Sequence, residues 1–490
     1  MSIHKREITV ILFIVYCLAW PTTASAQGKA DDSTGAGIED ILGGFDDEPK
    51  DASQVDDILG GFDDAPAEMD KTADESGKAA PSPVELGGSY TLASSYNYAH
   101  KAPEEGKTDY RGLSRLRSEL QIDIDIGISE QWKAFVSGRT FYDAAYAING
   151  RDNYTDKVLD TYEAETEFRD MFIQGTLTPN LDVKIGRQII VWGKSDNVRV
   201  TDVLNPFDNR EPGMVDIEDL RLPVTATRLD YYFDQWSVTA IAIHEIRFNK
   251  NPAYGSDFYP FDYVEPYEEK PGNSMKNWEY ALALNGIFKG WDISFYYARI
   301  FGDYPYGEVA RVAGAAEPII TLKHNRLQMY GVSANWAVKS WLIKAEAAYF
   351  DRLKYSFIQE EAKGRFDVLA GVEYAGFSDN ILSLEIVNRH IMGYDQKMEA
   401  TPDATGEDQF QSFFRYSGDF YNARLHILFL FSLFDTDGSD GGFGRLQAKY
   451  DIVDTLSVTA GVVTYQSGEN LFFNKIGDND RIFVDLKRSF

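Results

Sequence analysis

Three features of the chain predict an all-β fold, namely a transmembrane antiparallel β-barrel that follows a disordered acidic N-terminal segment. Residues 115–128 alternate strictly: apolar side chains stand at the even positions apart from Ser118, and polar ones at the odd positions as far as Asp125. Similar segments recur along the chain, joined in turn by short connections and long polar loops. The last of them ends in Phe490, a terminal aromatic residue that is typical of barrel proteins.

The alternation over residues 115–128 separates the two faces of one strand. A period of two places successive side chains on opposite faces. One face here is hydrocarbon and the other ionic, which a transmembrane barrel needs because lipid lies outside and water inside. Four residues of the ionic face are therefore predicted to line the lumen: Arg115, Arg117, Glu119 and Asp123. Both signs of charge occur among them, so no ion selectivity is predicted.

Residues 1–26 have the pattern of a secretory signal peptide. Lys5 and Arg6 precede an apolar run over residues 8–20, and Ala24-Ser25-Ala26 offers a small-x-small cleavage site. The run is short for a membrane span, although an uncleaved anchor is the alternative. Cys17, the single cysteine, lies inside this segment, so the mature chain is expected to have no disulfide and no thiolate metal site.

Residues 27–85 are predicted to form a disordered acidic tether in the periplasm. They are rich in Asp, Glu, Ala, Gly, Ser and Pro and nearly free of aromatic residues. The motif Asp-Ile-Leu-Gly-Gly-Phe-Asp-Asp occurs twice, at residues 40–47 and 57–64. Compact apolar anchors in a solvated tail typically dock into a groove or add to a sheet edge. The predicted docking residues are Ile41, Leu42, Phe45, Ile58, Leu59 and Phe62. A neutral duplication within a linker is the alternative.

Residues 86–490 are predicted to form the barrel. Short turns are expected at residues 129–131, 178–180, 234–235, 289–290, 338–340, 378–380 and 453–454, and long loops include 144–164, 194–221, 248–276 and 302–321. This asymmetry between the two ends is typical of outer-membrane barrels, and it gives about 18 strands. The alternative is about 16, because Gly418-Asp419 within residues 409–434 is either a turn or a kink.

The tryptophans give a separate indication of the same fold. Trp132, Trp236, Trp291 and Trp341 follow short turns, whereas Trp192 and Trp278 stand at long-loop ends. Interfacial girdles of aromatic residues have this distribution. A β-propeller is the soluble alternative, because Trp236, Trp291 and Trp341 recur at regular intervals, but it does not explain the strand at residues 115–128.

Residues 186–223 are the least generic part of the chain. They read Gly-Arg-Gln-Ile-Ile-Val-Trp-Gly-Lys-Ser-Asp from Gly186, Val-Arg-Val-Thr-Asp-Val-Leu-Asn-Pro-Phe-Asp from Val198, then Arg210-Glu211, and Asp-Ile-Glu-Asp-Leu-Arg-Leu-Pro from Asp216. On these motifs the chain resembles the bacterial outer-membrane, porin-like family catalogued as "domain of unknown function 1302". Members are often encoded near inner-membrane exporters of the resistance-nodulation-division type. The resemblance therefore implies a porin-like barrel, an exporter partner, and lipid-like or hydrophobic cargo.

This segment is the third long loop, and its charges can pair with one another. We hypothesise that it folds into the lumen and narrows it, as charged rings do in pores. The residues proposed to line the constriction are Asp196, Arg199, Asp202, Asn205, Asp208, Arg210, Glu211, Glu218, Asp219 and Arg221. A structured external cap held by salt bridges is the alternative.

Arg187, at the start of the segment, conflicts with the alternation. By parity with Val183 and Ile185 it would face lipid, at a cost of roughly 2–4 kcal/mol near the midplane. We expect a bulge at Gly186 that turns Arg187 inward, the alternative being a position near the interface.

Together these observations predict a channel in the outer membrane of a Gram-negative-type bacterium that passes small or amphiphilic molecules, with a periplasmic or inner-membrane partner. A closed barrel that acts through its external loops is the alternative.

The five histidines after the signal segment stand in no recognisable catalytic motif, so no enzyme activity, catalytic residue, cofactor or metal site is predicted. Asp435 to Gly441 resembles a calcium loop but is read as a tight turn. The formal net charge of −29 argues against binding to nucleic acid.

Overall fold

The computed structural model describes residues 83–215, 217–310, 318–356, 358–400 and 405–490, and the statements below concern these parts of the chain. The predicted signal peptide, the predicted tether up to residue 82 and both repeats, with Ile41, Leu42, Phe45, Ile58, Leu59 and Phe62, lie outside the described residues.

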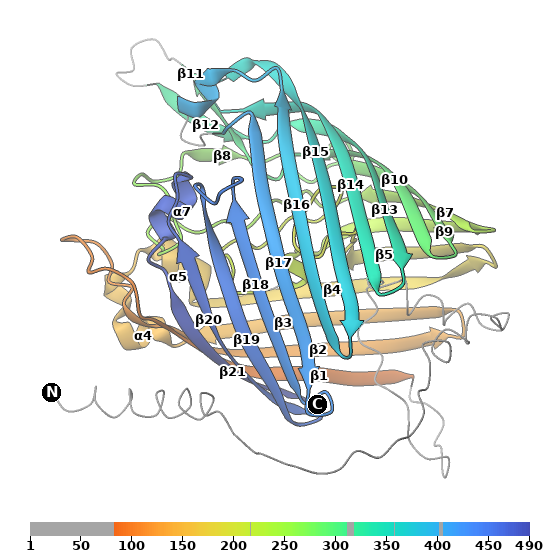
Figure 1. The fold of residues 1–490 in the computed structure, drawn as a ribbon, viewed down its shortest axis with the longest axis horizontal. Helices are drawn as coiled ribbons and strands as arrows, with labels where there is room; N and C mark the ends of the chain where they lie inside the picture. The colour runs from red at the N-terminus through yellow and green to blue at the C-terminus, as the bar shows by residue number, and fades with distance from the viewer. Residues whose placement is uncertain (1–82, 216, 311–317, 357, 401–404) are drawn as a thin grey trace, which may run out of the picture. The chain divides into compact units, whose positions relative to one another are not determined.

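Eighteen antiparallel strands form one closed barrel (Figure 1). The first strand pairs with the last, which removes both edges of the sheet. The strands are β1 (Val84–Asn97), β2 (Gly112–Ser129), β3 (Trp132–Asp143), β4 (Ala164–Thr178), β5 (Leu181–Gln188), β6 (Val224–Phe233), β7 (Trp236–Ile243), β9 (Glu279–Phe288), β10 (Trp291–Phe301), β13 (Arg326–Val338), β14 (Trp341–Tyr355), β15 (Ile358–Phe377), β16 (Asn380–Met392), β17 (Asp408–Phe420), β18 (Leu425–Phe434), β19 (Gly441–Val453), β20 (Leu456–Gln466) and β21 (Arg481–Ser489).

Smaller elements belong to the long connections. A three-stranded sheet contains β8 (Tyr267–Glu269), β11 (Tyr306–Ala310) and β12 (Ile319–Lys323). The short helices are α4 (Ala145–Asn149), η2 (Arg151–Asn153), α5 (Asp156–Tyr162), α6 (Ile217–Leu220), η3 (Gln396–Ala400) and α7 (Leu471–Ile476). Among the described residues, no helix combines the length and the apolar character needed to cross a membrane.

The strand count of 18 is confirmed, and the alternative of 16 is wrong. Residues 409–434 contain both β17 and β18, whose pairing runs from Gln411 opposite Phe434 to Phe420 opposite Leu425. The turn between them is at residues 421–424, so Gly418 and Asp419 lie within β17 rather than at a turn or a kink. The predicted short turns all fall between consecutive strands, at the end of the barrel opposite the long loops.

Three of the long connections lie between β5 and β13. Loop 3 comprises residues 189–223 between β5 and β6, loop 4 residues 244–278 between β7 and β9, and loop 5 residues 302–325 between β10 and β13. Each is longer than its predicted counterpart, and for loops 3 and 4 the reason is that the flanking strands β5, β7 and β9 are short.

The predicted bulge at Gly186 is wrong. Pairing of β5 with both neighbours runs without a shift through residues 185–187. Arg187 is instead the second-last residue of β5, at the rim of the wall, where its guanidinium lies 3.1 Å from the Glu167 carboxylate and 2.7 Å from that of Glu245. The register shift belongs to β4, whose pairing with β3 passes from Met171 opposite Val136 to Phe168 opposite Gly138.

Trp192 also departs from its predicted place. It was expected in an interfacial girdle, but its side chain is 7% exposed and stacks on Tyr296 of β10, with ring centroids 4.8 Å apart. Trp291, Trp336 and Trp341, near the short turns, are exposed on the barrel surface as an interfacial girdle requires.

Candidate functional site

Loop 3 packs against the inner wall of the barrel through an apolar core. Ile190, Trp192, Val198, Val200 and Leu204 are buried together with residues of β6, β7, β9, β10 and β13 to β17. Burial of apolar surface contributes about 25 cal/mol per Å². The loop is therefore held in place by the same force that forms a soluble core.

Small side chains on the inner wall make room for this core. Alanines on four strands are buried in it, whereas Leu282, between two of them, is exposed on the outer face. They are Ala226, Ala281, Ala283, Ala298 and Ala348. The inner wall thus has an apolar patch beside loop 3, whereas β2 carries a row of charges that includes Arg115 and Arg117.

Glu346 of β14 binds the backbone of loop 3. Its carboxylate accepts four hydrogen bonds, from the amides of Lys194, Ser195 and Thr201 and from the Thr201 hydroxyl, at 2.6–3.2 Å. Gly193, at φ 90°, permits this approach because a Cβ there would lie 2.9 Å from the carboxylate oxygens. Since Glu346 is buried, these charge-assisted bonds compensate its lost hydration.

Further buried charges hold the same turn of the loop. Glu385 of β16 accepts bonds from the Ser195 hydroxyl at 2.7 Å and from the Asn197 amide group at 3.0 Å. The Lys344 ammonium of β14 pairs with Asp196. Lys194 reaches β10, where its ammonium lies 2.7 Å from the Asp292 carboxylate.

Loop 3 is also bonded internally. The Arg221 guanidinium donates to the Asp202 carboxylate at 2.9 Å, with both side chains buried. Asn205 accepts from the Ile190 amide and donates to the Leu222 carbonyl, each at 2.7 Å, and so ties the two ends of the loop.

The loop extends to the opposite side of the barrel. The Tyr465 hydroxyl of β20 donates to the Pro212 carbonyl at 2.6 Å, and Met214 is buried with Val463 and Phe483 of β20 and β21. Glu211 lies 3.5 Å from Arg117 and 3.8 Å from Arg115, both on β2. Loop 3 therefore contacts strands from β10 to β21, and β2, across the lumen.

Electrostatics favour the charged form of Glu211. Burial alone raises the pKa of its carboxyl, but Arg117, Arg115 and two further arginines outweigh burial, so the pKa lies below its ordinary value. The pKa of Asp208 is lowered in the same way, against burial, by its hydrogen bonds and ion pair with Arg210. In loop 5 the balance is reversed: burial raises the pKa of Asp303 to about 6 although Arg199 lies 3.3 Å away.

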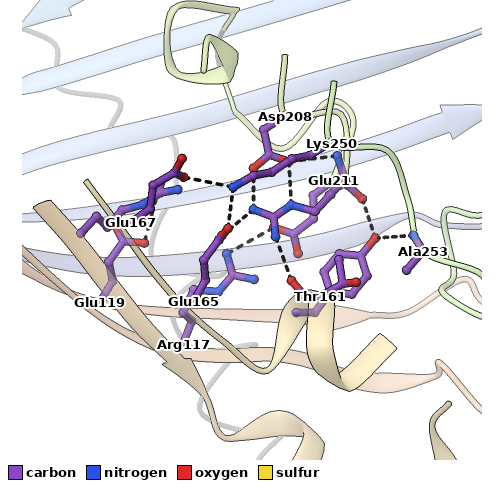
Figure 2. A network of polar contacts seen from close by, with 12 residues as sticks. Arg117, Glu119, Thr161, Glu165, Glu167, Asp208, Glu211, Lys250 and Ala253 are labelled. Carbon is purple, nitrogen blue, oxygen red and sulfur yellow. Dashed lines mark hydrogen bonds and ion pairs between the residues drawn. The ribbon is translucent and has the colours of Figure 1, made fainter. Parts of the chain in front are cut away.

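A network of ion pairs closes the rim of the wall between β4 and β5. Figure 2 shows Lys250 of loop 4 between Glu165 and Glu167 of β4, at 2.5 and 3.0 Å, with Asp208 nearby. Arg210 bridges Glu165 at 2.8 Å and Asp208 at 2.6 Å. We call the following eight residues the rim network: Glu165, Glu167, Arg187, Asp208, Arg210, Glu245, Arg247 and Lys250.

The residues predicted from the sequence are brought together only in part. Asp196, Arg199, Asp202, Asn205, Asp208, Arg210, Glu211 and Arg221 have partners within loop 3, on the inner wall or in loops 4 and 5. Asp219 follows in the short α6, and the side chain of Glu218 is not among those described. On β2, Glu119 lies 4.0 Å from Arg139, and Asp123 accepts a bond from Ser137 at 2.5 Å.

Sequence reasoning missed the partners of loop 3 on other elements. The sequence predicted no role as a partner of loop 3 for Lys344, Glu346, Glu385, Arg247 or Lys250. The sequence did contain a signal: Lys344 and Glu385 are charges on the inward faces of strands whose outward faces are largely apolar. Such residues are costly to bury unless they are paired.

Comparison with known proteins gives one family and a set of distantly similar structures. A family model described as "Protein of unknown function (DUF1302)" matches residues 12–490. No curated protein matches the chain. Solved structures that resemble it include Acinetobacter baumannii OccAB2, with a TM-score of 0.49 and 10% identity over 83% of this chain and 98% of that chain. The Pseudomonas aeruginosa outer membrane protein OpdK has a TM-score of 0.47 and 10% identity over 83% of this chain and 99% of that chain. P. aeruginosa OccK9 has a TM-score of 0.48 and 12% identity over 83% of this chain and 97% of that chain.

We predict that Glu346→Gln loosens loop 3. The amide replaces a buried carboxylate that accepts four bonds, and hydrogen bonds to charged groups contribute about 1.5–3 kcal/mol. We expect the free energy of unfolding to fall by about 2–3 kcal/mol, measured by urea titration of the protein folded into lipid vesicles. Glu373→Gln is the matched control, because Glu373 pairs with Lys344 and not with the loop. An equal loss of stability in both variants would contradict the conclusion that Glu346 holds loop 3.

We predict a pH dependence from Glu211. A carboxylate whose pKa is lowered on folding stabilises the native state above its unfolded pKa, and this contribution is lost as the pH falls through the folded value. The difference in Tm between the wild type and Glu211→Gln should therefore be full above pH 4.5, the ordinary value, and shrink on acidification. Glu130→Gln, in an exposed short turn, should show no such trend. A difference that stays constant to pH 3 would argue against the ion pairs with Arg115 and Arg117.

Proposed function

Because the chain belongs to the DUF1302 family of proteins of unknown function, we propose its function from the structure itself: it is an outer-membrane channel whose passage is set by loop 3. A closed barrel leaves no backbone group unpaired in lipid, and only helices and such barrels satisfy this condition. Apolar residues on the outer face, among them Leu282, Leu384 and Ile386, support the membrane location.

The observation that carries the proposal is the course of loop 3. Bonds to Glu346 and Glu385 hold one part of the loop, and bonds to Tyr465 and Arg117 hold the other. A loop held on both sides of a lumen forms a fixed narrowing. Charged residues of the loop whose side chains stay partly exposed, such as Arg199 and Glu211, would then meet a molecule that passes, as charged rings do in other pores.

The chemistry of the lumen supports small or amphiphilic cargo. Beside loop 3 the inner wall has an apolar patch, and β2 and the rim network present charges of both signs. A molecule with an apolar part and a polar part fits such a lumen better than a bare ion does.

A closed barrel is the second candidate. The same contacts that narrow the lumen also fill it, and the apolar core of loop 3 resembles the interior of a soluble domain. In that case the loops at the long-loop end would carry the activity.

Single-channel recording in planar bilayers tests both candidates. We compare the protein with a variant in which a short Gly-Ser linker replaces residues 196–219. Discrete conductance that increases in the variant is expected, because the shortened loop no longer crosses the lumen. Unchanged conductance would refute the constriction, and silence in both forms, with the folded state verified by electrophoretic mobility, would favour the closed barrel.

We also propose that the N-terminal repeats bind a periplasmic or inner-membrane exporter component. Two copies on one tail raise the effective concentration of the second after the first has bound. Phe45→Ala combined with Phe62→Ala should abolish co-purification of a periplasmic partner, whereas Ser53→Ala, between the repeats, should not. Unaltered co-purification would exclude the repeats as the docking sites.

A further inference from the structure

The barrel wall is discontinuous between β4 and β5. Only residues 171–178 of β4 pair with β5, whereas residues 164–168 pair with β3 alone. β5 and β7 have 8 residues each, and a tilted transmembrane strand needs about 9–11. The hydrogen-bonded wall therefore stops short at β5 to β7, next to a strand that continues.

Side chains of the rim network, and not a backbone ladder, fill this gap. Four cations and four carboxylates converge there from β4, β5 and loops 3 and 4. A ladder opens only when strands separate, but side-chain ion pairs can part by rotamer changes while the barrel stays intact. Parting of these ion pairs would therefore open this part of the wall without breaking the pairing of β4 with β3.

An apolar groove lies directly below the gap on the lipid-facing side. It has a volume of about 320 Å³ and is lined by Ala134, Val136, Met171, Phe172, Ile173 and Ile185. Met171, Ile173 and Ile185 are about half exposed and form its sides, while Ala134 and Val136 are small. The lining is hydrocarbon throughout, and the neighbouring rim is ionic.

We propose that this gap is a lateral portal, through which the acyl chain of an amphiphile passes between the lumen and the lipid phase. The chain would lie in the groove, and the charged head would exchange for one partner of the rim network. This inference rests on the proposed channel function and specifies its cargo and its route. It requires the rim network to open while β4 keeps its pairing with β3.

Cysteine labelling from the lipid phase tests the portal. In a Cys17→Ser background, Ser137→Cys places a thiol on the inner face opposite the β4 register shift, and Ser432→Cys places one on the inner face of the intact wall at β18. Both serines are buried, at 3% and 0% exposure. Each variant is treated with a hexadecyl methanethiosulfonate dissolved in the bilayer and with a charged, water-soluble methanethiosulfonate.

The ratio of the lipid-phase rate to the aqueous rate separates the route from thiol reactivity. We expect this ratio to be at least tenfold higher for Ser137→Cys than for Ser432→Cys. Adding Lys250→Met, which removes the pairs with Glu165 and Glu167, should raise the lipid-phase rate severalfold at residue 137 only. Lys250→Arg in its place keeps the positive charge, so the rate at residue 137 should stay at the value measured with Lys250. Only folded protein, separated by electrophoretic mobility, is counted.

Equal ratios at the two sites, unaffected by Lys250→Met, would overturn the portal. The outcome is independent of conductance. If the barrel conducts and the two labelling ratios are equal, the proposed channel function stands and the portal is refuted. A silent barrel with selective labelling at residue 137 refutes an ion-conducting channel, yet keeps the lateral opening.

Discussion

The closed backbone hydrogen-bond network is the constraint on which the remaining structure depends. In lipid every amide and carbonyl must be paired, so the first and last strands join and the sheet has no edge. Because β5 and β7 are short, backbone pairing of the wall is missing at one place, on the β5 side of residues 164–168 of β4. Loops 3 and 4 complete the wall there with side chains, which explains why the eight charged residues of the rim network gather in ion pairs beside β4.

Loop 3 satisfies a second constraint, which is the need to fill a wide lumen. A barrel of eighteen strands is too wide for its own side chains to fill the interior. The alanines of the inner wall leave space, the apolar residues of the loop occupy it, and Glu346 and Glu385 fix the loop at one position. Burial of apolar surface attracts the loop to the wall, while the buried carboxylates set its position, because an unpaired charge would be costly.

Local patterns predicted what depends on local geometry. Strand number and turn positions followed from the period of two, and the sequence placed Asp202 and Arg221 within one charged loop where they do pair. The contacts of loop 3 with the wall could not be predicted in this way. Ser195 and Glu385 are 190 residues apart, and only the register of all intervening strands brings them together. Trp192 was assigned to a girdle because its place at a strand end does not reveal that the chain then turns inward.

The contacts of loop 3 also bear on how the protein is assembled. The loop emerges from the fifth strand, yet it is bonded to β2 near the beginning and to β20 near the end of the chain. These contacts can therefore all be present only when β2 and β20 hold their places in the closed sheet. Docking of loop 3 and closure of the barrel thus stabilise each other, because each contact of the loop requires the strand that carries its partner.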